Sequence, residues 1–478
     1  RLALVGLLCT TLLALPALAE AQSARSRAVI GMVLEPTGLD PTMAPAAAIG
    51  EIVHYNVLEG LMKIGVDGSV TPLLAEGWAM DPDGKSYTFK LRRGVTFHDG
   101  EAFDASDVKF SFERAKAESS TNKAKKALFD NITSIATPDP YTVILTLDHA
   151  DGNTLFRLGE NPAVILDPKS AATTASRPIG TGPFRFEDWK KGSSVTLVKF
   201  PGFRNAAAVK LERVTFRIIN DPAAQVAALL AGDVDGFPRG LATQGLAQFR
   251  ADPRFTVATG STAGKGIVAM NNKRKPFDDV RVRRAIAHAI DRKAFIDGVL
   301  DGFARPIGSH MAPTDAGYVD LTAVTPYDPA KAQALLKEAG AKLPLEVTLT
   351  LPPPPYARKG GEVIAAQLAK VGIVAKIENV EWAQWLSGAY KGNFDLTIIN
   401  HVEPLDYLIY TDPKYYYGYD SKAFRELVSR HASTTNPKER LRLFGEIQRQ
   451  LAADAVNAYV FNPTQVVVAK KGLKGLWN

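Results

Sequence analysis

The stretch LEVTLTLPPPPYARKGGEVIAAQLAKVGIVAKIENV, residues 345–380, carries the pattern that decides the fold. Residues 345–351 and 373–380 are short segments with patterns typical of strands, and residues 359–371 between them have a helical pattern. Four consecutive prolines, 352–355, cannot continue a central strand, so we expect a stiff extended loop there. This order predicts two parallel strands joined through a helix by a right-handed crossover.

The next apolar run, FDLTIIN at residues 394–400, predicts a further buried strand. Open α/β sheets usually bind their ligands in the crevice outside the carboxyl ends of the strands. The segment that follows this run is therefore the first place to look for ligand-binding side chains.

Strand and helix patterns also alternate through the rest of the chain. Residues 86–91 alternate apolar and polar side chains, as a strand does. Asp104 with Asp107 predicts a helix start close to a capping box, and Asp-Pro at 328–329 and Asn-Pro at 436–437 predict two more. This alternation predicts a mixed α/β architecture.

The composition is that of a folded globular protein. The chain has 478 residues, of which 46% are hydrophobic and 22% charged, and this length suits two or three domains. The formal net charge is +7, but the basic residues are scattered among acidic ones. A nucleic-acid reader needs basic residues gathered on one face, so we expect no nucleic-acid partner.

The first residues have the pattern of a secretory signal peptide. Arg1 precedes an almost wholly apolar run at residues 2–15, and the small residues of Ala-Leu-Ala at 17–19 follow. The run is shorter than the roughly 20 residues that span a bilayer. A buried N-terminal helix is the alternative, but no polar stripe interrupts the run. We therefore expect residues 1–19 to be a signal peptide that is cleaved after Ala19.

The single cysteine, Cys9, lies inside this predicted signal peptide. A lipoprotein acceptor would need a small residue just before it, and Leu8 is not small, so we expect no lipid anchor. Without residues 1–19 the chain has no cysteine, which excludes disulfides and thiol chemistry. It also loses Arg1, so the net charge becomes +6.

A series of ordered motifs carries a resemblance to a known family. They are LAEGW (74–78), YTFKLR (87–92), GVTFHDG (94–100), GTGPF (180–184), LAGDVD (230–235), PFDDVRVRRAI (276–286) and the segment that opens with DPAK (328–340). Together they resemble the signature of extracellular solute-binding proteins of family 5, the dipeptide-, oligopeptide- and nickel-binding group. The resemblance covers the chain from about Val29 to its end. The glycine, proline and aspartate residues of these motifs suit turns and caps, and the aromatic residues suit the core.

The resemblance implies a periplasmic-binding-protein-like α/β fold, in which two α/β lobes close on a ligand cleft and an extra domain is inserted. Domain I would comprise residues 28–59, 177–271 and 456–478. Domain II would be the insertion at residues 60–176, and domain III would cover residues 272–455. The ligand would lie between domains I and III, which close around it by hinge motion.

The resemblance also implies a function. The protein would be a periplasmic substrate-binding protein of an ABC importer that captures a small solute, with a peptide as the favoured ligand. Its partners would be that ligand and a membrane-embedded ABC permease, and we expect a monomer without cofactor or bound metal. A metal chelate, an opine, heme or an oligosaccharide remain alternative ligands. A secreted hydrolase is the rival class, but Gly-x-Ser-x-Gly, His-Glu-x-x-His and a nucleophilic cysteine are missing from the sequence.

The candidate anchor for a peptide lies after the last predicted strand. In the peptide-binding members, a carboxylate there pairs with the amino terminus of the ligand, because a buried ammonium needs an anion. Glu403 and Asp406 are the two candidates, although the family usually shows Gly-Trp and then Asp near this point. His401 occupies the place of the usual aromatic residue. A single histidine is weak support for a metal, so we expect it to face the ligand or the core.

Aromatic side chains surround these candidates in the sequence. Trp382 and Trp385 are expected to end the preceding strand, and Tyr407 begins a tyrosine-rich stretch. Tyr356, after the prolines, and Thr37, after the first strand, match positions that border the pocket in relatives. Aromatic rings with polar tips suit a pocket for a mixed solute, although packing between domains is the favoured alternative for most of the tyrosines.

Overall fold

The computed structural model describes residues 26–44, 46–239, 245–434 and 436–476. The predicted signal peptide and its cleavage site lie outside these residues. Within them, no helix combines the length and the apolar character that crossing a bilayer requires.

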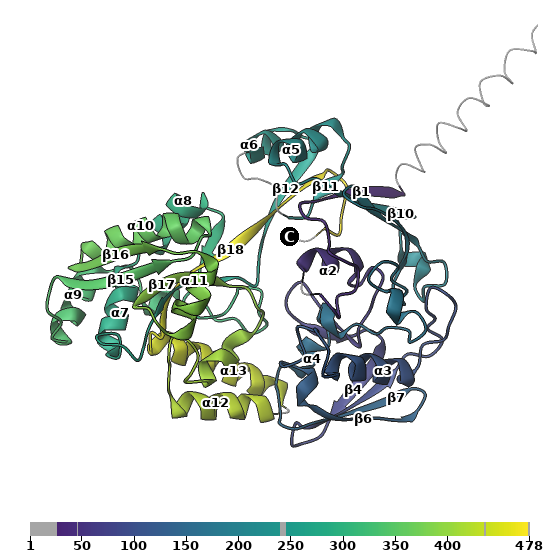
Figure 1. Ribbon diagram of the computed structural model, residues 1–478, viewed down its shortest axis with the longest axis horizontal. Coiled ribbons are helices and arrows are strands. Elements are labelled where there is room, and N and C mark those ends of the chain that lie inside the picture. Colours follow the sequence, from purple (N-terminus) through teal and green to yellow (C-terminus); the bar gives the residue numbers. More distant parts are fainter. Residues whose placement is uncertain (1–25, 45, 240–244, 435, 477–478) are drawn as a thin grey trace, which may run out of the picture.

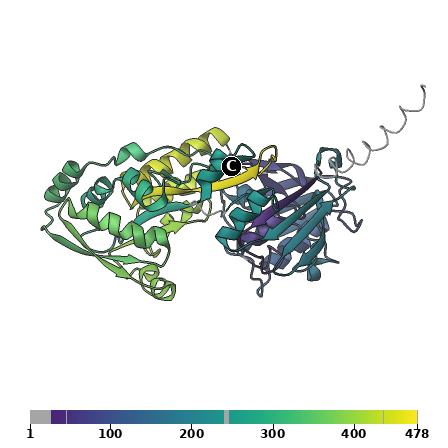
Figure 2. The same ribbon diagram turned by 90° about the horizontal axis from the view of Figure 1, so that it is seen from above.

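Twelve strands of the described residues form one continuous sheet that runs through two lobes (Figure 1). The long strand β18 (Asn457–Lys470) joins the lobes, because its first part pairs with β13 (Lys265–Met270) and its last part with β12 (Phe255–Ser261). Seen from above, β18 lies between the two lobes (Figure 2). The fold is therefore α/β with two lobes, as the sequence predicts.

The lobe of domain I is built around the first strand, β1 (Arg27–Met32). This strand is parallel to β10 and β11, and β9 and β8 continue the sheet in antiparallel order. The remaining elements of this lobe have the following bounds: α2 (Ala47–Val53), β8 (Phe184–Lys190), β9 (Ser194–Lys199), β10 (Arg213–Ile218), α5 (Pro222–Ala231), β11 (Gly236–Phe237) and α6 (Leu246–Ala251). The parallel arrangement brings the loop after β1, which contains Thr37, to the carboxyl edge of this sheet.

Domain II has its own antiparallel sheet in the order β4-β5-β7-β6, with its own apolar core. The predicted strand at residues 86–91 is confirmed as β5, and Tyr87, Phe89 and Leu91 are buried. Asp104 and Asp107 form the predicted capping box at the start of α3. The elements of this domain are β2 (Met62–Ile64), β3 (Val70–Pro72), β4 (Ala75–Met80), β5 (Ser86–Leu91), α3 (Ala105–Lys116), β6 (Ile132–Asp139), β7 (Thr142–Leu147) and α4 (Thr154–Arg157).

Domain III contains the strand–helix–strand unit. Strand β15 (Leu345–Leu351) is parallel to β16 (Ile373–Asn379) and to β17 (Leu396–His401), which confirms the three predicted strands. The connecting helix α10 (Pro355–Ala369) begins earlier than predicted, and the last of the four prolines is already helical. Proline is favoured at the first helical position because its fixed φ suits the helix and its missing N–H would have no partner there.

Helices cover the sheet of domain III, and the two helix starts predicted at residues 328–329 and 436–437 are confirmed. Asp328 accepts a hydrogen bond from the backbone N–H of Lys331 at 2.9 Å, and Asn436 accepts one from that of Lys438 at 3.0 Å. The elements not yet named are α7 (Val280–Ala289), α8 (Arg292–Leu300), β14 (Ala304–Pro306), α9 (Pro329–Glu338), α11 (Trp382–Ser387), η8 (Asp406–Thr411), α12 (Lys422–Ser433) and α13 (Pro437–Ala453).

The chain crosses between the two lobes at residues 262–264 and again inside β18. The side-chain amide of Asn462 donates to the carbonyls of Thr262 and Gly264, at 2.7 Å in each case. The Thr262 hydroxyl donates to the carbonyl of Pro463 at 2.9 Å. Hydrogen bonds thus join the two crossings to each other. The first crossing lies before the predicted domain limit at 271–272 and the second lies after the limit at 455–456, so both fall in segments predicted to belong to domain I.

Domains II and III also contact each other at the end of the molecule opposite β18, where α4 lies near α12 and α13 (Figure 1). The hydroxyl of Tyr407 donates to the Asn153 side chain at 3.2 Å, and the amide of Asn153 is 3.5 Å from the carbonyl of Leu405. Arg440 donates to the carbonyl of Gly152. Domain III therefore contacts domain II as well as domain I.

Candidate functional site

The candidate site lies at one edge of the sheet of domain III. The carboxyl ends of the parallel strands β15, β16 and β17 share this edge. Strand β13 is antiparallel to β17, so its first residue, Lys265, lies opposite His401 at the same edge. The segment 401–406 and Lys265 are thereby brought together from distant parts of the sequence.

The carboxylate of Asp406 is the centre of a buried polar network. The Lys265 ammonium nitrogen lies 2.9 Å from Oδ1, and the side chains of Lys265 and Asp406 are 1% and 9% exposed. Nε2 of His310, which follows β14, lies 3.2 Å from Oδ2, and Nδ1 of His401 lies 3.4 Å from it. Asp406 is therefore an internal ion-pair partner within domain III.

The electrostatics of this network follow from burial and charge pairing. Burial by itself would raise the pKa of Asp406, but His310, His401 and the Lys265 ammonium together hold that pKa well below its usual range. Burial lowers the pKa of His310 to about 4, although Asp406 opposes this shift. At neutral pH the network is thus a lysine–aspartate ion pair beside a neutral His310.

The side chains of His310, His401 and Asp406 have the donor types of a metal site, and their ligand atoms lie within 4.8 Å of one another. The Lys265 ammonium already neutralises the carboxylate, however, so a divalent cation would add positive charge beside a buried positive charge. The second nitrogen of each ring also bonds a tyrosine hydroxyl, Tyr410 at 2.9 Å for His310 and Tyr416 at 3.0 Å for His401. The arrangement fits an internal ion pair better than a metal site.

Glu403 differs from Asp406 because its side chain is exposed. Within the described residues, no basic side chain lies within ion-pair distance of its carboxylate, and Oε2 accepts only a long hydrogen bond from the Val402 N–H at 3.3 Å. The backbone of Glu403 is fixed from the protein interior, since the buried Lys265 ammonium donates a hydrogen bond to the Glu403 carbonyl. The Glu403 carboxylate is therefore free to meet a ligand.

The two predicted tryptophans take different positions. They do not end the strand β16, as the sequence analysis expects, but lie on the short helix α11 that follows it. Glu381 and Gln384 form a capping box that starts this helix. Trp385 is buried and donates from Nε1 to the hydroxyl of Thr397 at 3.0 Å, whereas Trp382 is 42% exposed. Only Trp382 offers a large open surface.

The other predicted residues are distributed over both lobes and a domain contact. Tyr356 lies at the edge site, where its hydroxyl accepts from the backbone N–H of Asn400 at 3.2 Å. Thr37 is exposed in domain I, on the lobe opposite this site. Tyr407 is buried and points to Asn153 of domain II. The structure thus groups Tyr356, the tryptophans and segment 401–406, and separates Thr37 and Tyr407 from them.

Lys265 and His310 are two residues of this network that were not predicted from the sequence. Lys265 is a single charged residue at the start of the otherwise apolar strand KGIVAM, and a buried charge in such a strand needs a partner. That pattern could have indicated an ion pair, although it could not have indicated Asp406 as the partner. His310 has no comparable signal, because its neighbours are unremarkable loop residues.

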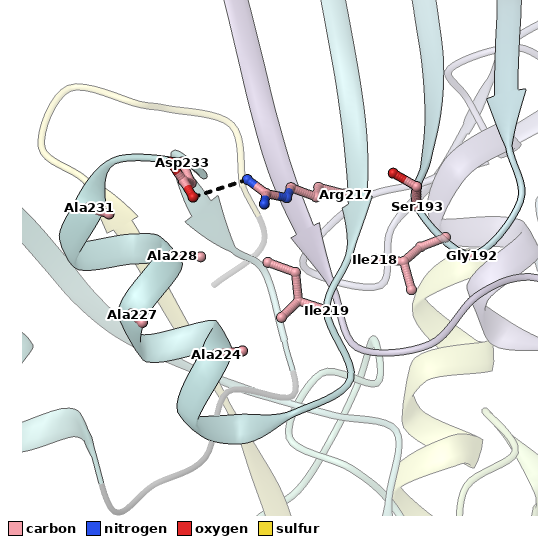
Figure 3. Close-up of a pocket in the computed structure, with 10 residues that line it drawn as sticks. All are labelled: Gly192, Ser193, Arg217, Ile218, Ile219, Ala224, Ala227, Ala228, Ala231 and Asp233. Atoms are coloured by element: carbon pink, nitrogen blue, oxygen red, sulfur yellow. Dashed lines mark ion pairs between the residues drawn. The ribbon is translucent and has the colours of Figure 1, made fainter.

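A separate hollow lies in domain I, away from the candidate site (Figure 3). It is lined by small side chains of α5, such as Ala224 and Ala228, and by the ion pair between Arg217 and Asp233 at 3.3 Å. None of the candidate site residues lines it. This hollow does not support an alternative position for the site.

Two α/β lobes joined by paired crossings, with polar and aromatic side chains at the strand edge of one lobe, define the class of solute-binding proteins that close around a ligand. Comparison with known proteins identifies the family. Residues 69–422 match the family described as "Bacterial extracellular solute-binding proteins, family 5 Middle", and the chain belongs to it. Members of this family bind peptides or other small solutes and work with ABC permeases; they are not enzymes.

Three similar proteins illustrate the family. The Di/tripeptide-binding protein 1 of Pseudomonas aeruginosa (strain UCBPP-PA14) is 31% identical, with 76% of this chain and 73% of the relative covered. The Heme-binding protein A of Haemophilus influenzae is 30% identical, with 82% and 79% covered. The structure of the periplasmic binding protein DppA from Helicobacter pylori in complex with peptide STSA has a TM-score of 0.73 at 27% identity, with 96% of both chains covered. The family and fold expected from the sequence are confirmed.

Proposed function

We propose that this protein is exported to the periplasm, binds a short peptide between domains I and III, and delivers it to an ABC permease in the membrane. It acts as a monomer, and the signal peptide is removed near Ala19. The observation that carries the peptide assignment is the exposed Glu403 carboxylate at the carboxyl edge of the domain III sheet. The similarity to a di/tripeptide-binding protein and to a peptide complex supports it.

Of the two candidate anchors, Glu403 is the one that we assign to the ligand. The amino terminus of a peptide leaves water when the lobes close, and its ammonium then needs a carboxylate partner. The carboxylate of Asp406 already has Lys265 as its partner at 2.9 Å and is almost fully buried. Glu403 has no such partner among the described residues, so its charge is available.

The surroundings of Glu403 suit the apolar parts of a peptide. Trp382 is 42% exposed and Tyr390 38% exposed in domain III, and Trp385 connects them, with ring centroids 5.7 Å from each. In domain I, Leu34 is 62% exposed and lies close to Thr37 in the loop after β1. Closure would bring these two surfaces to the ligand, with Tyr356 and His401 at its border.

Heme is the second candidate ligand, because a heme-binding protein is as similar to this chain as the peptide-binding ones. Native mass spectrometry of the protein purified from a periplasmic extract separates the two by the mass of the bound molecule. The same spectrum gives the mature mass, and cleavage after Ala19 predicts a chain that starts at Glu20 without lipid.

Calorimetric titration provides the binding test. We expect trialanine to bind and N-acetyltrialanine to bind far more weakly, because acetylation removes the ammonium. Equal binding of both, or heme in the native spectrum, would exclude the ammonium anchor. Incubation with trialanine, followed by mass spectrometry, tests the rival hypothesis of a secreted hydrolase. A hydrolase would release free alanine from the peptide.

A further inference from the structure

We infer that Lys265 is a positioning residue for ligand binding: it orients the Glu403 carboxylate by holding the loop from Glu403 to Asp406 at two points. This inference rests on the proposed function, because it concerns the anchor of the same site. It adds a residue that lies 138 positions before the anchor in the sequence.

The Lys265 side chain makes two contacts with this loop. Its ammonium donates to the backbone carbonyl of Glu403 and lies 2.9 Å from Oδ1 of Asp406. These two residues are the two ends of the loop. The side chain is 1% exposed, so a single buried ammonium fixes both ends from beneath while the Glu403 carboxylate remains on the surface.

The backbone of the loop is strained at one residue between these two contacts. Leu405 adopts the left-handed region, with φ 49° and ψ 34°. This region is unfavourable for a residue with a side chain and persists only where the surroundings impose it. The contacts of Lys265 on both sides of Leu405 supply such a constraint.

Lys265 lies next to the point where the chain crosses between the lobes. It is the first residue of β13 and follows directly on the crossing at residues 262–264. The carbonyl of Gly264, its neighbour, accepts from Asn462 of the other crossing at 2.7 Å. The anchor loop is therefore held by a residue at the junction between the lobes, so the carboxylate keeps its position relative to the hinge.

The ion pair also sets the charge that the ligand meets. Lys265 neutralises Asp406, which leaves Glu403 as the one unpaired carboxylate of segment 401–406. One unpaired carboxylate matches a ligand with one ammonium. Without Lys265, the Asp406 carboxylate would lose its ammonium partner, and the loop would lose both of its contacts with the lysine.

The test uses three variants of the full-length mature protein: Lys265→Met, Asp406→Asn and the double variant. Each single variant leaves a buried charge without its partner, so both should unfold at a lower temperature than the parent. The double variant removes both charges and should recover most of that loss, because neutral replacement of a buried ion pair costs little. Thermal unfolding of the three variants and the parent protein measures these differences in stability.

Two readouts then separate positioning from stability. In both variants that lack Lys265, we expect trialanine to bind at least about tenfold more weakly in calorimetry, and amide hydrogen exchange at residues 402–406 to be faster. Recovered stability with weak binding and fast exchange in the double variant supports the inference. A double variant that binds and exchanges like the parent would overturn it, because the pair would then only fill the core.

A wrong peptide assignment can be distinguished from a wrong role for Lys265. A parent protein that binds neither trialanine nor its acetylated form would refute the peptide assignment. The exchange rates at residues 402–406 still decide the role of Lys265 in that case. If amide hydrogen exchange at residues 402–406 is unchanged in Lys265→Met, then Lys265 does not fix the loop, whichever ligand the protein binds.

Discussion

Neutralising the two candidate carboxylates one at a time should have different effects: loss of the Glu403 charge should weaken binding, and loss of the Asp406 charge should lower stability. Glu403→Gln removes an exposed charge that has no ion pair among the described residues, so the free energy of unfolding should change by less than about 1 kcal/mol. If Glu403 holds the ligand ammonium in the closed site, the variant should lose roughly 2–5 kcal/mol of binding free energy. That is a loss of affinity between tens of times and several thousand times.

Asp406→Asn should have the opposite profile. It leaves the Lys265 ammonium, which is 1% exposed, without a counter-ion, and loss of one partner of a buried pair costs about 3–5 kcal/mol of stability. For a folding unit of domain size this lowers the unfolding midpoint by roughly 6–20 °C. Its affinity should fall less than that of Glu403→Gln, because the carboxylate does not reach the ligand.

Thermal unfolding and calorimetric titration with trialanine, run on the same preparations, measure both quantities. Glu346→Gln is a matched control, since Glu346 is also an exposed carboxylate of domain III but lies near the amino end of β15, at the far edge of the sheet. The control should change neither quantity. If Asp406→Asn abolishes binding without loss of stability while Glu403→Gln binds like the parent, then Asp406 and not Glu403 is the anchor.

Three further predictions follow from the contacts and the burial. Tyr407→Phe removes the hydroxyl that bonds Asn153 and His431, so it should cost about 1 kcal/mol and speed hydrogen exchange in the domain II segment around Asn153; unchanged exchange would exclude this contact in solution. Burial lowers the pKa of His310 and of His431 from 6.5 to about 4, so their unfolded forms bind protons first as the pH falls. The unfolding midpoint should therefore drop between pH 6.5 and pH 4. Burial raises the pKa of Asp315 to about 6, and this group opposes the drop over part of the range. An unfolding midpoint that stays constant from pH 7 to pH 5 would contradict the prediction. Ligand should reduce the radius of gyration in small-angle scattering, because only the closed form contacts it with both lobes, and an identical curve at saturation would speak against closure.

Local patterns in the sequence were sufficient for the elements and the family. Strands β5, β15, β16 and β17 follow from short-range alternation and apolar runs, and the caps of α3, α9 and α13 from side chains that bond the next turn. Where the prediction was wrong, the error was also local. The proline run was assigned to a loop although its last member starts α10, and α11 was taken for the end of a strand because a helix of one or two turns leaves little periodicity.

The partner of each charge in the candidate site was decided by tertiary structure alone. The sequence marks Glu403 and Asp406 as equal candidates, since both follow the same strand. They differ only because the antiparallel register of β13 and β17 places Lys265 beneath the loop, where it pairs with Asp406 and leaves Glu403 exposed. A distant strand pairing brings these charges together, and the free energy of a buried charge depends on its nearest partner in space. Neighbouring residues in the sequence do not contain that information.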